Sequence, residues 1–279
     1  MCSSMDSESG NSNKKGRKSK ACVIDLHTLL IHSAKAVVDD RRRAGELLME
    51  IQQHASPTGD ATQRLAYWFA EGLEARLTGT GSHGTLRGLP KWQTVCIEDL
   101  DLEPDEVLAV NDLYNFRTLM DECVVIGSPN PRDIVLSNIS KMKPDVFVQS
   151  TVNGSHGTFF LSRFREALFF YSDLFDMLDA TMPRESKLRL ALECDVFGWV
   201  VLNAIAHEGK DWVERGETYK HWQVRNKRAG LRQLPLDSEP VKMARDMVKN
   251  EYHKDFVIDE DHQWLLQGVE GSHPLGSLK

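Results

Sequence analysis

The chain has 279 residues, 41% of them hydrophobic, so it is long enough to bury a sizeable core in one large or two small domains. Its formal net charge of −7 at pH 7 argues against general electrostatic coating of nucleic acid, so any DNA contact needs a local basic patch. The five cysteines are dispersed without a C-x-x-C spacing, which argues against a disulfide framework or a zinc ribbon and fits a reducing compartment.

The first 20 residues are rich in Ser, Asn, Gly and Lys and predict a disordered basic tail. The tail is polar where a secretory signal would be apolar, and no later apolar run is long enough to span a bilayer, which predicts a soluble intracellular protein. A basic cluster in the tail is typical of a nuclear-localisation signal, although a solvated tail has the same composition. The basic residues of this candidate are Lys14, Lys15, Arg17, Lys18 and Lys20.

Residues 21–78 predict a small unit of three amphipathic helices. Apolar residues recur at helical spacing from Leu26 to Val38, from Leu47 to Ile51 and from Leu65 to Leu77. Asp60 is placed to cap the third helix. The leucines of the first helix also match L-x-x-L-L, a pattern by which helices dock into grooves of partners, although ordinary core packing is the favoured explanation. These partner-docking candidates are Leu26, Leu29 and Leu30.

Residues 79–90 predict a linker. The run from Gly79 to Gly84 matches G-x-G-x-x-G letter for letter, which is the fingerprint of a dinucleotide-binding loop. Such a loop needs a strand before it and a helix after it, so that backbone N–H groups meet phosphate. Here a helix precedes the glycines and Leu86 to Pro90 cannot open another, so the phosphate-binding interpretation is rejected.

From residue 91 onward, strand and helix patterns alternate. Strands are predicted around Val95–Ile97, Val107–Asn111 and Val146–Gln149, with a helix from Pro131 to Met142 between the last two. A long helix, with Thr158 as its cap, then carries an apolar stripe that should pack onto the sheet. This alternation predicts an α/β sheet with crossover connections. The residues of the stripe are Phe160, Phe164, Leu168, Tyr171 and Phe175.

The C-terminal third predicts a helix from Pro183 whose buried face carries Leu188, Leu192 and Val196. A hairpin is predicted around Asp259–Gln263, and residues 269–279 are expected to be a disordered tail. A basic run lies between these features and could contact phosphates, although a solvated face is the commoner explanation for such a run. The residues of this candidate are Arg225, Lys227, Arg228 and Arg232.

No catalytic, cofactor-binding or metal-ligating residue is predicted. His207-Glu208 is not followed by the second histidine of an H-E-x-x-H zinc helix. Ser82 and Ser155 each lie in Gly-Ser-His-Gly, but neither has the first glycine that a G-x-S-x-G nucleophile turn requires.

Several stretches resemble, in order, motifs of the GRAS family of plant transcription regulators, in its scarecrow-like branch. Asp25–Val37 and Arg64–Leu73 are similar to that family's first leucine-rich region, and Arg163–Glu166 resembles the end of its PFYRE motif. Trp212–Arg215 resembles the RVER motif with its first residue changed to Trp. The VHIID motif, the second leucine-rich region and the start of PFYRE are missing between Leu77 and Lys91, and the end of the chain departs from the SAW motif.

The resemblance implies an α/β fold: an incomplete Rossmann-like, methyltransferase-like sheet flanked by helices, with an N-terminal α-helical cap. The cap would be residues 21–78 and the sheet region residues 91–268. The missing block should supply several strands, so its absence should remove part of the surface on which the N-terminal helices pack. We therefore expect Cys22–Leu77 to depend on a partner or a second copy, and the sheet region to be the better ordered part.

The resemblance also implies a transcription regulator acting in the nucleus through protein–protein interaction, without a cofactor and not at a membrane. Its partners would be other transcription factors and related family members, as homo- or heterodimers, with DNA bound directly or through partners. Two alternatives stay open. One is a methyltransferase-like enzyme, although the cofactor site of that fold would fall within the missing block. The other is a non-functional or dominant-negative shortened form.

Overall fold

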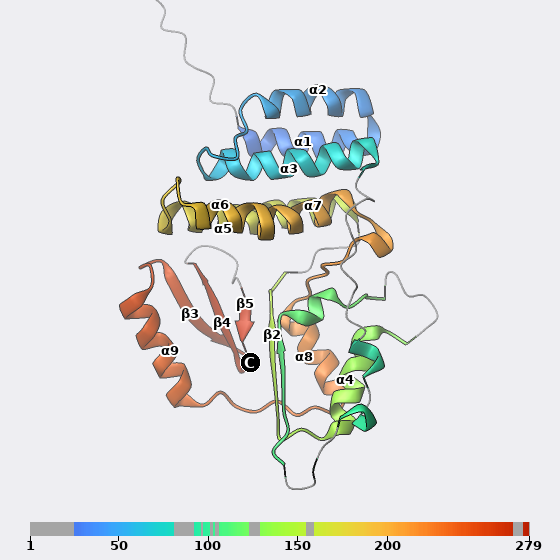
Figure 1. Ribbon diagram of the computed structural model, residues 1–279, viewed down its shortest axis with the longest axis vertical. Helices are drawn as coiled ribbons and strands as arrows, with labels where there is room; N and C mark the ends of the chain where they lie inside the picture. Colours follow the sequence, from blue (N-terminus) through green and yellow to red (C-terminus); the bar gives the residue numbers. More distant parts are fainter. Residues whose placement is uncertain are drawn as a thin grey trace, which may run out of the picture.

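The computed structural model describes residues 25–80, 92–95, 97–100, 103, 106–122, 129–154, 159–269 and 276–278. Three helices form an upper layer, a second layer of helices lies beneath them, and a sheet with its own helices lies below both (Figure 1). The upper layer consists of α1 (Leu26–Asp39), α2 (Arg41–Gln52) and α3 (Ala61–Thr78).

The three upper helices begin where the sequence provides caps. The carboxylates of Asp25, Asp40 and Asp60 accept hydrogen bonds from the first-turn backbone N–H groups of α1, α2 and α3. Asp60 forms a full capping box with Gln63, and α3 ends at Gly79, whose φ of 74° lies in the left-handed region that glycine adopts without strain. The prediction of a three-helix N-terminal unit is therefore confirmed.

Helix α5 (Phe160–Thr181) buries the whole predicted stripe from Phe160 to Phe175. Its N-cap is Phe159, which makes no side-chain cap hydrogen bond, and Thr158 lies outside the described residues. The stripe faces the helices: the rings of Phe164 and Phe69 of α3 meet edge-on with centroids 5.4 Å apart. The prediction that this stripe packs onto the sheet is wrong, because α3 offers an equally apolar face and helical spacing alone does not choose a partner.

The same core contradicts the expectation that the N-terminal helices lack support. Leu30, Leu65 and Phe69 are at most 1% exposed, and they share one hydrophobic cluster with residues of α5 and α7 (Trp199–Ala206). Helices from the C-terminal half thus supply the surface that the upper layer needs. The helical part of the fold extends beyond residues 21–78.

One continuous helical stretch forms the rest of the second layer: α6 (Lys187–Ala191), the π-helix η5 (Leu192–Gly198) and α7. The prediction that the face of this helix with Leu188, Leu192 and Val196 is buried is wrong. Leu188 and Val196 are 64% and 45% exposed, whereas Arg189 and Glu193 are buried. Periodicity missed this orientation because the buried face is held by ion pairs. At Gly198 the helix meets the Trp68 ring so closely that a Cβ there would lie 2.7 Å from ring atoms.

The sheet has the strand order β1-β2-β5-β4-β3. Strands β1 (Ala109–Leu113) and β2 (Val146–Thr151) are parallel, as a crossover through α4 (Pro131–Met142) requires. Strands β3 (Phe256–Asp261) and β4 (Trp264–Val269) form the predicted antiparallel hairpin. Its turn is made by His262 and Gln263, with φ of 50° and 65°.

Strand β5 (Gly276–Leu278) joins the two halves of the sheet by pairing antiparallel with both β2 and β4. The prediction that residues 269–279 form a disordered tail is therefore wrong for β5 and for Val269, which ends β4. A three-residue strand has too few side chains to show an alternating pattern, and its position between two longer strands defines it. The predicted strand at Val95–Ile97 is also wrong, since short 3-10 turns, η2 (Trp92–Thr94) and η3 (Ile97–Asp99), lie there instead.

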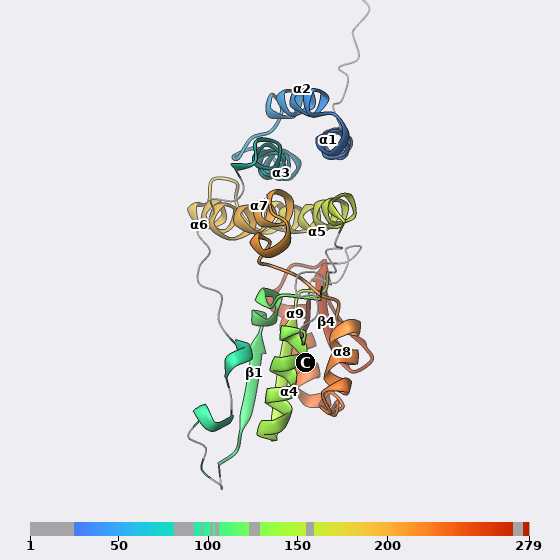
Figure 2. The ribbon, with the colours of Figure 1, turned by 90° about the vertical axis from the view of Figure 1, so that its right-hand side faces the viewer.

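Helices α4 and α8 (Tyr219–Arg228) cover one face of the sheet and enclose a second core around Leu136, Trp222 and Trp264. Figure 2 shows α4 and α8 alongside the strands, below the helical layers. Helix α4 begins at Pro131, as predicted, and the side chain of Asn130 caps it. A further helix, α9 (Ser238–Glu251), lies against β3 at the far side of the sheet (Figure 1). The observed fold is thus the predicted α/β architecture, an incomplete Rossmann-like sheet flanked by helices with a helical cap.

Candidate functional site

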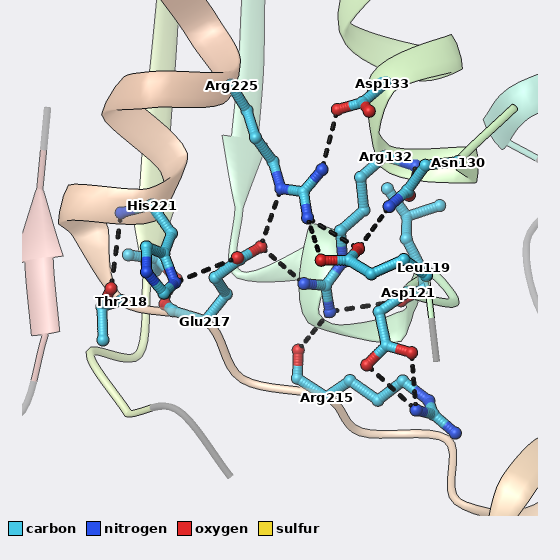
Figure 3. Close-up of polar contacts among 12 residues, drawn as sticks. Leu119, Asp121, Asn130, Arg132, Asp133, Arg215, Glu217, Thr218, His221 and Arg225 are labelled. Atoms are coloured by element: carbon cyan, nitrogen blue, oxygen red, sulfur yellow. Dashed lines mark hydrogen bonds and ion pairs between the residues drawn. The ribbon is translucent and has the colours of Figure 1, made fainter. Parts of the chain in front are cut away.

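A buried cluster of arginines and carboxylates ties α4 and α8 to the segment before α8 (Figure 3). Glu217 is its centre: the carboxylate accepts hydrogen bonds from Arg132 Nη1 at 2.6 Å and Arg225 Nε at 3.1 Å. The side chains of Arg132, Glu217 and Arg225 are 3%, 10% and 9% exposed. Charges this far from water remain ionised only when each is matched by an opposite charge, so the three residues form one structural unit.

Arg225 uses all sides of its guanidinium within the protein. It also donates to Asp133 at 2.8 Å and to Glu122 at 2.8 Å. Burial lowers the pKa of Arg225, but the surrounding carboxylates, Glu217 first among them, outweigh burial and raise the pKa above its ordinary value. The prediction that Arg225 contacts phosphate is therefore wrong, because its donors already serve internal carboxylates. The other residues of that candidate, Lys227, Arg228 and Arg232, are exposed.

Arg132 connects this cluster to the segment that resembles the RVER motif. Its Nη2 donates to the backbone carbonyl of Arg215 at 2.7 Å, and its guanidinium lies 5.4 Å from the Trp222 ring centroid. Burial lowers the pKa of Arg132, while the nearby charge of Glu217 raises it in part. The guanidinium thus fixes both the backbone of the motif-like segment and the aromatic core beneath α8.

The indole of Trp212 is in contact with the arginines of both motif-like stretches, Arg163 and Arg215. The Arg215 guanidinium carbon lies 4.3 Å from the Trp212 ring centroid, and that of Arg163 lies 4.5 Å from it. Arg215 also binds both carboxylate oxygens of Asp121, at 2.9 and 3.0 Å. Trp212, the residue that departs from the family motif, is therefore where the two stretches meet.

The His207-Glu208 pair serves the same scaffold. Arg163 donates through Nη2 to the Glu208 carboxylate at 2.6 Å and to the His207 carbonyl at 3.2 Å. Glu208 also pairs with Arg76 of α3 at 2.8 Å. Burial lowers the pKa of Arg163, and the hydrogen bond to Glu208 opposes that shift. Glu208 is thus engaged by two arginines.

A second buried network attaches the upper layer to the continuous helix. Arg64 of α3 pairs with Glu193, and Glu193 also accepts from Arg189 Nε at 2.7 Å. Arg189 reaches Asp179 of α5 at 3.0 Å. Arg64, Arg189 and Glu193 are each no more than 1% exposed. These pairs explain why the charged side of α6 and η5 faces inward.

A cavity of about 330 Å³ lies between β1 and α4, closed on one side by Trp92, Val95 and Leu100. Its lining is apolar except for Asn138, Asn111, Asn115 and Asp112. Asp112 accepts from the backbone N–H groups of Asn115 and Phe116, while burial raises its pKa to about 6. Among the described residues, the lining holds one carboxyl group and no histidine, cysteine, serine or lysine, so these residues present no nucleophile–base pair.

The other predicted site residues are not gathered into a site. Leu26 and Leu30 are 6% and 1% exposed and lie in the helical core, so the favoured explanation, ordinary core packing, is confirmed for them and the alternative of partner docking is wrong. Leu29 is half-buried against that core. The nuclear-localisation candidates Lys14, Lys15, Arg17, Lys18 and Lys20 lie outside the described residues.

The described residues contain no group of three His, Cys, Asp or Glu side chains arranged to hold a metal ion. Over the same part of the chain, no helix combines the length and apolar character needed to cross a membrane. Sequence reasoning missed Arg132, Glu217 and Asp121 as site residues. Each of these residues pairs with a residue far away in the chain, so local sequence patterns do not reveal the pair. The sequence offered only their positions beside a proline or a motif-like segment.

Fold and site together define the class of protein as a methyltransferase-like α/β domain with a helical cap. Its buried arginines pair with carboxylates of other elements and stabilise the domain. A model of the GRAS domain family matches residues 26–94 and 85–273, and the chain belongs to this family. The family's proteins are generally transcription regulators. The two matched segments overlap at residues 85–94, which include the end of the linker predicted at residues 79–90.

Among curated relatives, Scarecrow-like protein 9 of Arabidopsis thaliana is 37% identical over 365 residues, covering 89% of this chain and 51% of the relative. Scarecrow-like protein 14 of Arabidopsis thaliana is 33% identical, covering 91% of this chain and 48% of the relative. The chain spans about half the length of these curated relatives. Both alignments are longer than the chain and so contain gaps, while the missing internal block itself stays a prediction.

The fold is also that of a solved structure. The crystal structure of SCL7 in Oryza sativa superposes with a TM-score of 0.76 at 19% identity, covering 91% of this chain and 99% of that chain. At this identity the similarity establishes the fold.

Proposed function

We propose that this protein is a non-enzymatic transcription regulator that acts in the nucleus through contacts with other transcription factors. The observation that carries the proposal is the family match, which extends over both the helical cap and the sheet region. The ion pairs support it: Arg163, Arg215 and Glu208 serve the scaffold and are not turned toward a substrate cavity. We therefore expect partner proteins to bind the outer surface of the domain.

Direct DNA contact is a further part of the proposal, through Lys227, Arg228 and Arg232. These residues are exposed at and just beyond the end of α8, whose position is fixed by the buried Arg225. Three phosphate contacts would give a modest, salt-dependent affinity. Replacing all three by Ala should then reduce the salt dependence of binding to duplex DNA, with the exposed Lys242 and Lys249 of α9 replaced in a control.

A tethering assay tests regulation. The chain is fused to an unrelated DNA-binding domain upstream of a reporter gene in plant cells. We expect reporter output to change relative to the DNA-binding domain alone. A Glu217→Gln variant, which removes the central charge of the buried cluster and destabilises the fold, should weaken the change, whereas Glu260→Gln at an exposed pair should keep it. If a well-expressed, folded fusion gave the same reporter output as the DNA-binding domain alone, the proposal would be contradicted.

Nuclear action is tested separately. A fluorescent fusion should be enriched in the nucleus, and replacement of Lys14, Lys15, Arg17, Lys18 and Lys20 by Ala should remove that enrichment. Unchanged enrichment in this variant would show that the basic cluster is not the signal.

A methyltransferase-like enzyme is the second candidate, favoured only by the fold. Titration calorimetry with S-adenosylmethionine separates the two. Saturable heat with the purified chain favours an enzyme, whereas no heat together with reporter activity favours the regulator. A third candidate is a shortened form that competes with full-length relatives. Co-expression with such a relative in the reporter assay would then lower the relative's output.

A further inference from the structure

The cavity between β1 and α4, which lie side by side in Figure 2, has the size and the lining of a small-molecule site. Its volume of about 330 Å³ falls within the range of ligand pockets and is about twice that of an apolar cavity that holds benzene. Most of its described lining is apolar, with the aromatic rings of Trp92 and Phe116 among the aliphatic side chains. A ligand of one or two rings would therefore fill it.

One charged side chain, Asp112, belongs to the described lining of this cavity, and it is 3% exposed. It projects from the face of β1 that α4 covers, since Val110 on the same face packs into the core that contains Ile139 of α4. Its Oδ1 accepts from the backbone N–H groups of Asn115 and Phe116. Its Oδ2 has no partner within hydrogen-bond distance among the described residues. A buried carboxylate oxygen without a partner costs free energy, which a ligand that donates to it would recover.

The charge of Asp112 is not balanced by a cation of its own. Burial raises the pKa of its carboxyl group to about 6, and the backbone N–H groups, the neighbouring amide of Gln149 and the charge of Arg117 oppose that shift only in part. Arg117 pairs instead with Glu214 at 2.7 Å and donates to the Tyr114 carbonyl at 3.0 Å. At neutral pH the carboxyl group is therefore ionised, buried and short of positive charge. A ligand that brought a cation would supply that charge.

We propose that this cavity binds a compact aromatic amine, with its ring against the apolar walls and its ammonium group on Oδ2 of Asp112. The other polar groups of the described lining are the amides of Asn111, Asn115 and Asn138, whose oxygens can accept from an ammonium group. Asn138 already donates through Nδ2 to the Val95 carbonyl at 2.9 Å, so its Oδ1 is the atom that can accept from a ligand. The described lining has no lysine, arginine or histidine, so an acid with the same ring would find no counter-charge there.

Titration calorimetry on the purified full chain tests the proposal with three probes that share one indole ring and one linker length. Tryptamine carries an ammonium group, tryptophol a hydroxyl group and indole-3-propionate a carboxylate. At pH 8, where the Asp112 carboxyl group is ionised, we expect tryptamine to bind saturably and indole-3-propionate not to bind. Tryptophol should bind about tenfold more weakly than tryptamine, because its hydrogen bond to the carboxylate lacks the second charge. The proposal is wrong if tryptamine does not saturate the chain below about 1 mM, or if the propionate binds as tightly.

A matched pair of variants assigns the binding to Asp112. Asp112→Asn keeps an acceptor for the backbone N–H groups but removes the charge, so it should lower the affinity for tryptamine about tenfold and that for tryptophol less than about threefold. Asp145→Asn is the control, because it neutralises an exposed carboxylate that accepts from the backbone N–H of Leu108, and it should keep both affinities. Unchanged tryptamine affinity in Asp112→Asn overturns the proposal.

Hydrogen exchange gives the location of the bound probe independently of any variant. Tryptamine should slow backbone exchange in β1 and α4, whose residues line the cavity, and leave exchange in α2 unchanged. Slower exchange confined to elements away from β1 and α4 would show that the amine binds elsewhere and would overturn the proposal.

Discussion

The guanidinium carbon of Arg163 lies 4.5 Å from the ring centroid of Trp212, two residues that are 49 positions apart in the chain. Arg163 belongs to α5 and Trp212 to the irregular segment before α8, so this contact joins the helical layers to the sheet region. Because the indole is 4% exposed, the cation–π contact is formed away from water, where it is strongest. The same indole serves Arg215, so one side chain orients two arginines.

Trp212→Leu should destabilise the protein by about 3 kcal/mol, since it removes a buried ring together with its contacts to two guanidiniums. Thermal unfolding followed by circular dichroism measures the effect. Trp199→Leu is the matched control, because Trp199 is 40% exposed on α7 and should change stability by less than about 1 kcal/mol. Equal losses of stability in the two variants would show that the burial of Trp212 and its contacts with two guanidiniums do not stabilise the fold as argued.

Glu217→Gln should cost about 3–5 kcal/mol, because it leaves Arg132 and Arg225 buried with one fewer compensating charge. Urea unfolding gives the free energy directly. Glu260→Gln removes a carboxylate from a pair whose partners are 49% and 42% exposed, and it should cost no more than about 1 kcal/mol. A small effect at Glu217 would show that water reaches the cluster and replaces the lost carboxylate.

Phe164→Ala should destabilise the protein by about 3–5 kcal/mol, and the loss should be felt across the helical layers. Phe164 is 1% exposed and meets Phe69 of α3, so its removal opens a cavity between α5 and α3. Hydrogen exchange should therefore speed up in α1 and α3 more than in β3 and β4. Phe169→Ala, on the same helix at 52% exposure, is the control. Faster exchange confined to the sheet would place the stripe of α5 where the sequence predicted it.

The elements that sequence reasoning predicted are those fixed by local rules. The cap at Asp60, the start of α4 at Pro131 and the helical spacing of the α5 stripe each depend on residues within a few positions of one another. Strand β5 has no such local signal, since its neighbours in the sheet determine that it pairs. Periodicity shows that a helix has an apolar face, but it does not show which element covers that face.

The ion-pair clusters were not predicted from the sequence, because the residues that pair in them are far apart in the chain. Arg225 appeared to be one of a run of exposed basic residues, yet its partners Asp133 and Glu122 are 92 and 103 positions away. Arg189 and Glu193 likewise appeared to be the polar side of a helix, and a third residue, Arg64, reverses that helix's orientation. A single sequence carries no record of such pairs, because charge type alone does not specify a distant partner.

Asp112 should make the stability of the protein depend on pH, because burial raises the pKa of its carboxyl group to about 6 from an ordinary value of 3.8. A carboxyl group that binds its proton more tightly in the folded state destabilises the fold once it is ionised. Its contribution is therefore most favourable below about pH 4 and is lost as the pH rises through about 6. Asp112→Asn keeps an oxygen that can accept from the N–H groups of Asn115 and Phe116. The variant should thus gain up to about 3 kcal/mol over the natural chain at pH 8 and little at pH 4.

Asp179 provides a control of opposite sign. A hydrogen bond from Arg184, followed by one from Arg189, outweighs burial and lowers the pKa of Asp179 to about 2. Its stabilisation is present above about pH 4 and is lost as the pH falls through about 2, so Asp179→Asn should be less stable than the natural chain at pH 7. Urea unfolding of both variants and the natural chain between pH 4 and pH 8 measures the two differences. If Asp112→Asn showed the same difference from the natural chain at every pH, the Asp112 carboxyl would be reached by water. The wall of the β1–α4 cavity would then be open at that point.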